Sequence, residues 1–158
     1  MGECRAYAVR QCCPMPLRAL AEIIFPTSCV ACALPGRLLC EVCDRALDRI
    51  GPVGCERCGH PWPLAVARCP QCPAQLRSVR HAVEYHGPAR ELIRALKFAQ
   101  IRAVADLLGD LIVSAIPRPA GVLVPVAACD ARLRERGFNQ AELIARAVSE
   151  QWGNEVVG

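Results

Sequence analysis

The chain has 158 residues, of which 53% are hydrophobic and only 4% aromatic, so any core that it builds is mainly aliphatic. Nineteen basic and fifteen acidic residues give a net charge of +4, a mild bias that permits an anionic partner without requiring one. The prolines and glycines follow no period, which excludes a collagen-like chain, and no apolar run is long enough to cross a membrane.

The compartment expected from the sequence is the cytoplasm. The first residues lack the apolar segment of a secretory signal, because Arg10, Arg18 and Glu22 interrupt every candidate. Thiols stay reduced in the cytoplasm, so the twelve cysteines of this chain are not expected to form disulfides. Metal binding is therefore the first hypothesis for them.

An N-terminal segment, residues 1–28, precedes the cysteine-rich part of the chain. Residues 1–14 show no period, whereas the apolar residues of 17–24 recur at helical spacing up to Pro26. We expect a short amphipathic helix here. Because residues 1–14 match no pattern, we also expect translation to begin at Met15.

Residues 29–75 contain four Cys-x-x-Cys pairs and too few aliphatic residues to build a core of their own. A Cys-x-x-Cys turn directs two thiolates at one ion, and two such turns complete the tetrahedral sulfur shell that Zn²⁺ favours. The spacing predicts a double zinc ribbon with two structural zinc ions and no open coordination position. The predicted ligands are Cys29, Cys32, Cys40, Cys43, Cys55, Cys58, Cys69 and Cys72.

Alternatives to this assignment stay open at the level of the sequence. Pairing in sequence order joins 29/32 to 40/43 and 55/58 to 69/72, but an interleaved arrangement also satisfies the spacing. A redox dithiol or an iron–sulfur cluster would use the same residue type. We interpret His60 as a surface residue, because four thiolates already complete each site.

Residues 76–158 show both strand and helix patterns. Strands are expected at 79–85 and 122–126, the second as the continuous apolar run that is typical of a buried parallel strand. Helices are expected at 89–99, 104–116 and 139–152. The first of these helices carries Arg90, Arg94 and Lys97 on its polar face.

A charged loop, residues 132–138, is expected between the second strand and the last helix. Backbone N–H groups and the helix dipole favour an anion at such a helix N-terminus. Gly137 permits close approach of the backbone, and the guanidinium groups of Arg134 and Arg136 can bind phosphate oxygens in pairs. The alternative interpretation is a solvated charged loop.

Three segments resemble the ComF family of competence-associated proteins, also called amidophosphoribosyltransferase-like. They are Ile23-Ile-Phe-Pro26 before the first cysteine pair, the stretch Tyr85-His-Gly-Pro-Ala-Arg-Glu-Leu-Ile-Arg-Ala-Leu-Lys-Phe98, and Arg132-Leu-Arg-Glu-Arg-Gly-Phe-Asn-Gln-Ala141. With the cysteine pairs between them, the resemblance extends from about Leu20 to Trp152.

The resemblance implies a small zinc-ribbon module followed by an α/β domain like that of type I phosphoribosyltransferases. Residues 122–126 would be the first strand of its parallel sheet, and residues 132–140 the loop on its pyrophosphate side. In an intact relative, the residues that contact phosphate or pyrophosphate would be Arg134, Arg136, Gly137, Asn139 and Gln140.

The chain departs from the family pattern in two places. The family has Pro-Leu-His-Pro where this chain has residues 127–130, and Asp130 puts an acid near the expected phosphate site. The loop for phosphoribosyl diphosphate (PRPP) needs two adjacent acids and Thr-Thr-Gly, but this sequence has no adjacent acids and only Thr27. We therefore expect an α/β domain that is incomplete, truncated before the PRPP loop, association-prone and without enzymatic activity.

Several functions stay open. The resemblance implies a role in DNA uptake during natural transformation, in a cytoplasmic protein without membrane insertion. A zinc-ribbon adaptor could instead bind single-stranded DNA or a competence helicase, with nucleic-acid contacts from Arg90, Arg94 and Lys97. The third alternative is a non-functional gene fragment.

Overall fold

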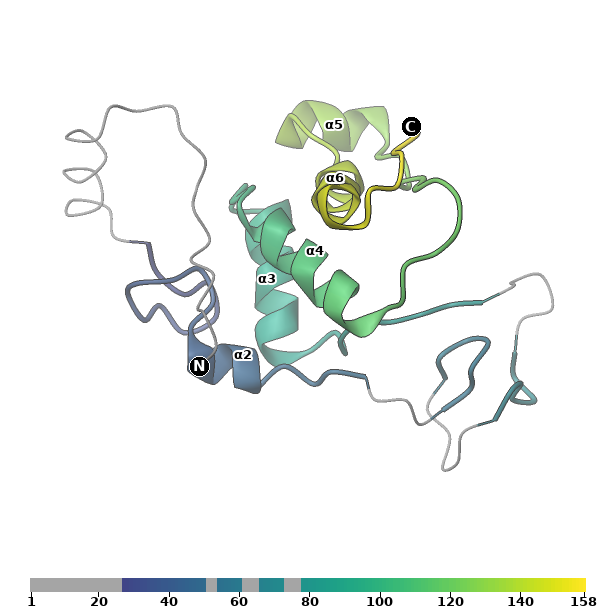
Figure 1. The fold of residues 1–158 in the computed structure, drawn as a ribbon. Helices are drawn as coiled ribbons and strands as arrows, with labels where there is room; N and C mark the ends of the chain where they lie inside the picture. Colours follow the sequence, from purple (N-terminus) through teal and green to yellow (C-terminus); the bar gives the residue numbers. More distant parts are fainter. Residues whose placement is uncertain (1–26, 51–53, 61–65, 73–77) are drawn as a thin grey trace.

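The computed structural model describes residues 27–50, 54–60, 66–72 and 78–158. The expected N-terminal helix and the expected start at Met15 lie outside these ranges. No helix within them is long and apolar enough to cross a membrane. The helices that they contain are α2 (Glu41–Arg45), α3 (Gly87–Lys97), α4 (Val104–Ala115), α5 (Asp130–Arg136) and α6 (Gln140–Trp152) (Figure 1).

The helices expected at 89–99 and 104–116 are confirmed as α3 and α4. α3 begins earlier than expected because Pro88 lies in its first turn, where the missing N–H of proline costs no hydrogen bond. α4 ends at Ala115 because the residue before a proline avoids helical backbone, and Ile116 is accordingly extended.

The helix expected at 139–152 is confirmed as α6. The Asn139 side chain caps its start by accepting a hydrogen bond of 3.1 Å from the N–H of Ala141. At its end, Gly153 takes left-handed backbone with φ 69°.

The hydrophobic core is helical. α4 packs against both α3 and α6, and the side chains of Leu92, Leu96 and Val104 are fully buried. Leu47, which follows α2, and Phe138, which precedes α6, belong to the same core. The cysteine-rich and helical parts of the chain therefore share a core on the α2 side.

α4 and α6 cross at a position that only small residues permit. A Cβ placed on Gly109 would lie 2.8 Å from the Cβ of Ala147, closer than two such atoms can approach. This close approach brings the backbones of the two helices together, and it explains a glycine in the middle of α4.

The strand expected at 79–85 is present only as short antiparallel pairing with the segment that follows α2. Arg49 and Val83 form a single bridge, and the N–H of Glu84 donates to the carbonyl oxygen of Asp48 at 2.9 Å. The paired residues lie on either side of the second cysteine cluster in the sequence, between α2 and α3.

The prediction of a buried strand at 122–126 is wrong. Val122, Val124 and Val126 are 51%, 70% and 81% exposed, and the segment has one parallel bridge, from Leu123 to Val156. A parallel strand becomes buried only with neighbours on both sides and helices on both faces, and this segment has one short neighbour. Within the described ranges, bridges like this one are the entire β structure, so no sheet supports the implied α/β domain.

The charged loop expected at 132–138 is helical over most of its length, as α5. Asp130 lies in its first turn and Arg134 and Arg136 in its last, the charge order that a helix dipole favours. Gly137 ends the helix with φ 73°. Periodicity could not reveal α5, because none of its residues is buried.

Candidate functional site

The first cysteine cluster contains Cys29, Cys32, Cys40 and Cys43, whose sulfur atoms all lie within 4.8 Å of one another. The Sγ atoms of Cys32 and Cys40 are 3.6 Å apart. Four sulfurs at 2.3 Å from a central Zn²⁺ would be separated by about 3.8 Å. The first cluster therefore has the donor set and the spacing for one zinc ion.

Two different local structures build the first cluster. The first pair lies in a tight turn, in which the N–H of Ala33 donates to the carbonyl oxygen of Cys29 at 2.8 Å. The second pair lies at the start of α2, where Cys40 is the N-cap and Cys43 is buried in the first turn. Helix formation thus places the second pair of thiols opposite the first.

The second cysteine cluster contains Cys55, Cys58, Cys69 and Cys72. Three of its sulfurs, those of Cys55, Cys58 and Cys72, lie within 4.8 Å of one another. The Sγ of Cys69 is 3.6 Å from that of Cys58, and the N–H of Cys69 donates to the Sγ of Cys55 at 3.2 Å. The pairing in both clusters follows sequence order, and each cluster could bind a zinc ion.

The electrostatics of both clusters favour a cation. Burial alone raises the pKa of the Cys29 thiol, but backbone N–H donors of Cys40, Ala31 and Cys32 outweigh burial and lower it to about 6. Burial and the neighbouring thiols raise the pKa of Cys43. A soft divalent cation at the centre would allow every thiol in a cluster to deprotonate.

In the second cluster the first cysteine again differs from the others. Burial is outweighed at Cys55 by backbone N–H donors from Cys58, Cys69 and Arg57, so that its pKa falls to about 6. The pKa of Cys69 rises to about 11, through burial and then through its contact with the Cys58 thiol. The thiolate is the form of cysteine that a soft divalent cation binds.

The two clusters differ in what surrounds them. Leu39, beside the first cluster, packs against the helical core. Among the hydrophobic residues that the structure describes, the second cluster packs against its own cysteines and Val66. Figure 1 shows residues 54–60 and 66–72 set apart from the helices.

The histidines lie beside the second cluster rather than in it. His60 is exposed, and its carbonyl oxygen accepts a hydrogen bond from the N–H of Cys55 at 3.0 Å. The ring of His81 lies against Gly59, with Nε2 3.3 Å from the carbonyl oxygen of Cys58. No pattern in the sequence indicated this contact.

The residues expected to bind phosphate have different surroundings in the structure. Arg134 is exposed on α5, and the guanidinium of Arg136 lies over the Phe98 ring, 5.3 Å from its centre. The amides of Asn139 and Gln140 already bind backbone, since they donate to the carbonyl oxygens of Val126 and Phe138. Gly137 serves to end α5.

The residues expected to contact nucleic acid also differ among themselves. Arg90 and Arg94 both pair with Glu91, at 3.2 Å and 3.8 Å. Lys97, at the end of α3, is exposed and has no ion pair within the described part of the chain. No sequence motif pointed to Arg102, whose guanidinium lies 4.6 Å from the centre of the Phe138 ring.

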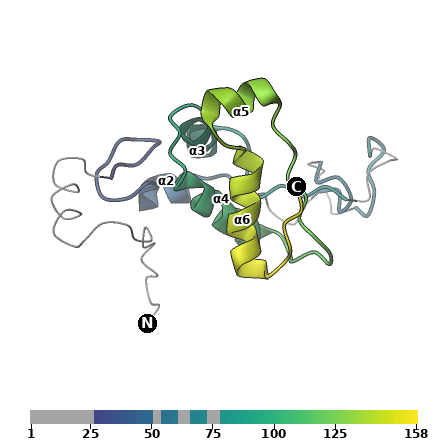
Figure 2. The same cartoon turned by 90° about the horizontal axis from the view of Figure 1, so that it is seen from above.

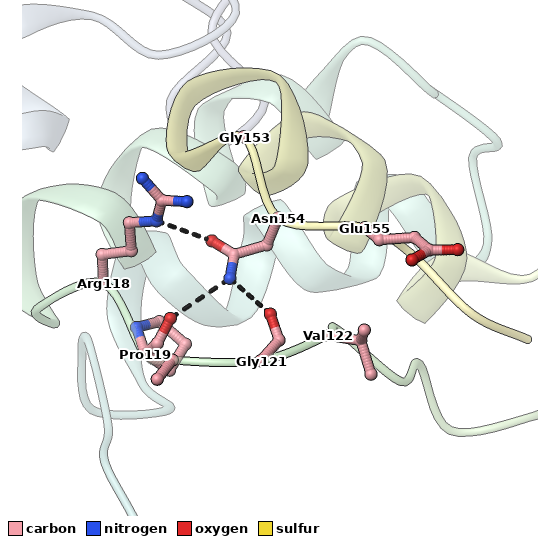
Figure 3. Close-up of a pocket in the computed structure, with 8 residues that line it drawn as sticks. Arg118, Pro119, Gly121, Val122, Gly153, Asn154 and Glu155 are labelled. Atoms are coloured by element: carbon pink, nitrogen blue, oxygen red, sulfur yellow. Dashed lines mark hydrogen bonds between the residues drawn. The ribbon is translucent and has the colours of Figure 1, made fainter.

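An open hollow of about 600 Å³ lies between residues 118–122 and 153–155 (Figure 3). Asn154 occupies its wall and is only 6% exposed. Its side-chain amide donates to the carbonyl oxygens of Pro119 and Gly121 at 3.1 Å and 2.6 Å, and its side-chain oxygen accepts from Arg118 at 3.1 Å. These bonds hold the residue after the end of α6 against residues 118–121, which lead into the exposed segment 122–126. The hollow is therefore lined by contacts that stabilise the fold.

Comparisons of this chain with protein-family models, with curated proteins and with solved structures find no match. The resemblance to the ComF family therefore rests on the sequence motifs.

Proposed function

We propose that this chain is a ComF-type protein associated with DNA uptake, in which two structural zinc sites support a helical part that binds single-stranded DNA. The observation that carries the proposal is a basic surface at the C-terminal ends of α3 and α5. We define this basic surface as Lys97, Phe98, Arg102, Arg134 and Arg136.

The meeting of two motifs supports the ComF assignment. Phe98 ends the motif that forms α3, and Arg136 belongs to the motif that forms α5, yet the two side chains stack on each other. Phe138, from the second motif, lies in the core with Leu92 and Leu96 from the first. Motifs distant in sequence thus form one structural unit, as expected if they belong to a single domain type.

Charge supports the nucleic-acid assignment. Within the described residues, no carboxylate lies within ion-pair distance of any cation of the basic surface, whereas Arg132 on the same helix pairs with Glu135 at 2.7 Å. Cations at helix C-termini are common because the dipole favours them, but the dipole does not account for an exposed aromatic ring among them. Phe98 is 66% exposed. Unpaired cations beside an exposed ring are the elements of a site for single strands.

Fluorescence anisotropy of a labelled oligothymidine with the zinc-loaded chain tests the proposal. Binding should weaken as salt rises, with a slope in log–log form of about −2 to −3, because three or four phosphates would be neutralised. Absence of binding at low salt, or binding that salt does not affect, would contradict it. Heat on calorimetric titration with PRPP would favour a transferase-like ligand site instead.

A further inference from the structure

Both Arg102 and Arg136 of the basic surface lie over a phenylalanine ring. Arg102 lies over Phe138 and Arg136 over Phe98, at 4.6 Å and 5.3 Å from the ring centres. A terminal nitrogen of Arg102 would lie 3.9 Å from a Cβ on Gly137, the residue after Arg136. The loop after α3 and the end of α5 therefore approach each other at Arg102 and Gly137, and Figures 1 and 2 together show α5 lying over one end of α3.

The two rings have different surroundings. Phe138 is 7% exposed, so its stack with Arg102 belongs to the edge of the core. Phe98 is 66% exposed, and Arg136 lies on it. One ring thus anchors a cation, while the other leaves aromatic surface open to solvent next to a cation.

The guanidinium of Arg136 is incompletely satisfied. Its Nε is buried and has no hydrogen-bond partner in the described part of the molecule. A buried donor without an acceptor is unfavourable. Because this Nε is closed to solvent, a ligand would reach the terminal nitrogens of the guanidinium instead, and a phosphate oxygen is the acceptor that a guanidinium binds best.

Stacking also fixes the orientation of the two cations. A guanidinium held against a ring loses less conformational freedom on binding than a free arginine side chain, so it is preorganised for a planar, two-point contact. A nucleotide base could stack on the open part of Phe98 while its phosphate reaches the arginines.

We infer that Arg102 and Arg136 together bind one phosphate of single-stranded DNA while Phe98 stacks on the adjacent base. This inference rests on the proposed function and names the residues of its site. It also moves the phosphate contact away from Asn139 and Gln140, whose amides are already bound to backbone.

The experiment uses the full zinc-loaded chain with two labelled strands of equal length, oligothymidine and its abasic counterpart. The variants are Arg102→Gln, Arg136→Gln and Phe98→Leu. The matched control is Arg146→Gln, which removes the same charge from an exposed arginine that pairs with Glu142 on α6. Circular dichroism and zinc content establish that each variant folds.

Arg102→Gln and Arg136→Gln should each weaken binding of both strands about tenfold or more, and Arg146→Gln should change it less than about threefold. Phe98→Leu should weaken oligothymidine binding at least about fivefold, since stacking accounts for that much per base, and should leave abasic binding unchanged. Arg136→Lys keeps the charge without the planar fork and should lose nearly as much as Arg136→Gln.

The outcomes separate the two proposals. If the native chain binds neither strand, both proposals fail. If it binds with the expected salt dependence but the arginine variants resemble Arg146→Gln, only the residue assignment is overturned. If inorganic phosphate displaces both strands equally and Phe98→Leu has no effect, the pair binds free phosphate and the stacking role is overturned.

Discussion

The residue after each leading Cys-x-x-Cys pair takes left-handed backbone, with φ 62° at Ala33 and φ 68° at Gly59. This conformation costs an alanine about 1 kcal/mol or more, and a glycine nothing. We predict that Ala33→Gly stabilises the first cluster by up to about 1 kcal/mol, because glycine's greater freedom in the unfolded chain offsets part of the gain. Chelator competition and thermal unfolding measure it.

The reverse change at the equivalent position serves as the control. A Cβ on Gly59 would lie 2.6 Å from Cδ2 of His81, so Gly59→Ala should destabilise the second cluster by about 1–3 kcal/mol. If Ala33→Gly and Gly59→Ala changed the stability of their clusters in the same direction and by the same amount, left-handed backbone would not determine the stability of these turns.

At the scale of helices, the crossing of α4 and α6 depends on Gly109. Alanine is normally the better helix former, by about 1 kcal/mol, but here its Cβ would collide with that of Ala147. We predict that Gly109→Ala lowers the free energy of unfolding by about 1–3 kcal/mol, measured by urea denaturation. Adding Ala147→Gly should recover part of this loss. If Gly109→Ala alone stabilised the protein, α4 and α6 would be able to move apart at no cost in free energy.

The same helix pair carries an acidic side chain in an unfavourable place. Partial burial, and then the nearby carboxylates of Glu150 and Asp110, raise the pKa of Asp106 above 3.8. The folded chain therefore binds a proton more tightly than the unfolded chain, and stability falls as pH rises from about 3.8 through the raised pKa.

Asp106→Asn should accordingly stabilise the protein at neutral pH, by less than about 1 kcal/mol because the group is largely exposed. The advantage should disappear below about pH 4. The free energy of unfolding of the native chain and of the variant, measured across pH, gives this difference. Zinc loss in acid affects both proteins equally, so its effect cancels. An advantage that persists in acid would indicate a gain in helix propensity instead.

Periodic elements could be predicted from the sequence, and contacts between elements could not. The apolar spacing around Leu92 and Leu96 predicted α3, because a buried face imposes its period on the sequence. α5 has no buried face and so no period. Arg102 precedes α4 as a lone arginine, and only the folded chain shows that Phe138 lies beneath it.

The ligands of the cysteine clusters could be predicted, because each Cys-x-x-Cys turn is local and needs only its spacing. The pairing could not, because an interleaved arrangement has the same spacing, and only the folded chain shows that it follows sequence order. Residues 122–126 were mistaken for a buried strand because burial depends on neighbours that the segment itself does not encode. Its exposed valines have one bridge, to Val156.

For the whole molecule, we predict two zinc ions per chain with sulfur ligands only. Elemental analysis should give this stoichiometry, and X-ray absorption should show about 2.3 Å zinc–sulfur distances. A single ion per chain, or nitrogen among the ligands, would contradict the assignment of two sites with four sulfurs each.

The two sites should differ in what depends on them. Cys43→Ser disturbs a cluster whose neighbour Leu39 packs on the helical core. Cys72→Ser disturbs a cluster whose hydrophobic contacts in the described part of the chain are its own cysteines and Val66. We expect the first substitution to reduce the helical signal in circular dichroism and to lower the melting temperature. The second should release one zinc ion with little change in either. Equal loss of helix in both variants would show that the second cluster also supports the core.

The core that joins Leu47 to Phe138 has a consequence for the order of events during synthesis. The first cluster is complete as soon as Cys43 has left the ribosome, whereas the core cannot close until Phe138 and α6 have followed. Chains begin to fold from the N-terminus while synthesis continues. Zinc can therefore bind the first cluster while the chain is still being made, before the helices assemble on it.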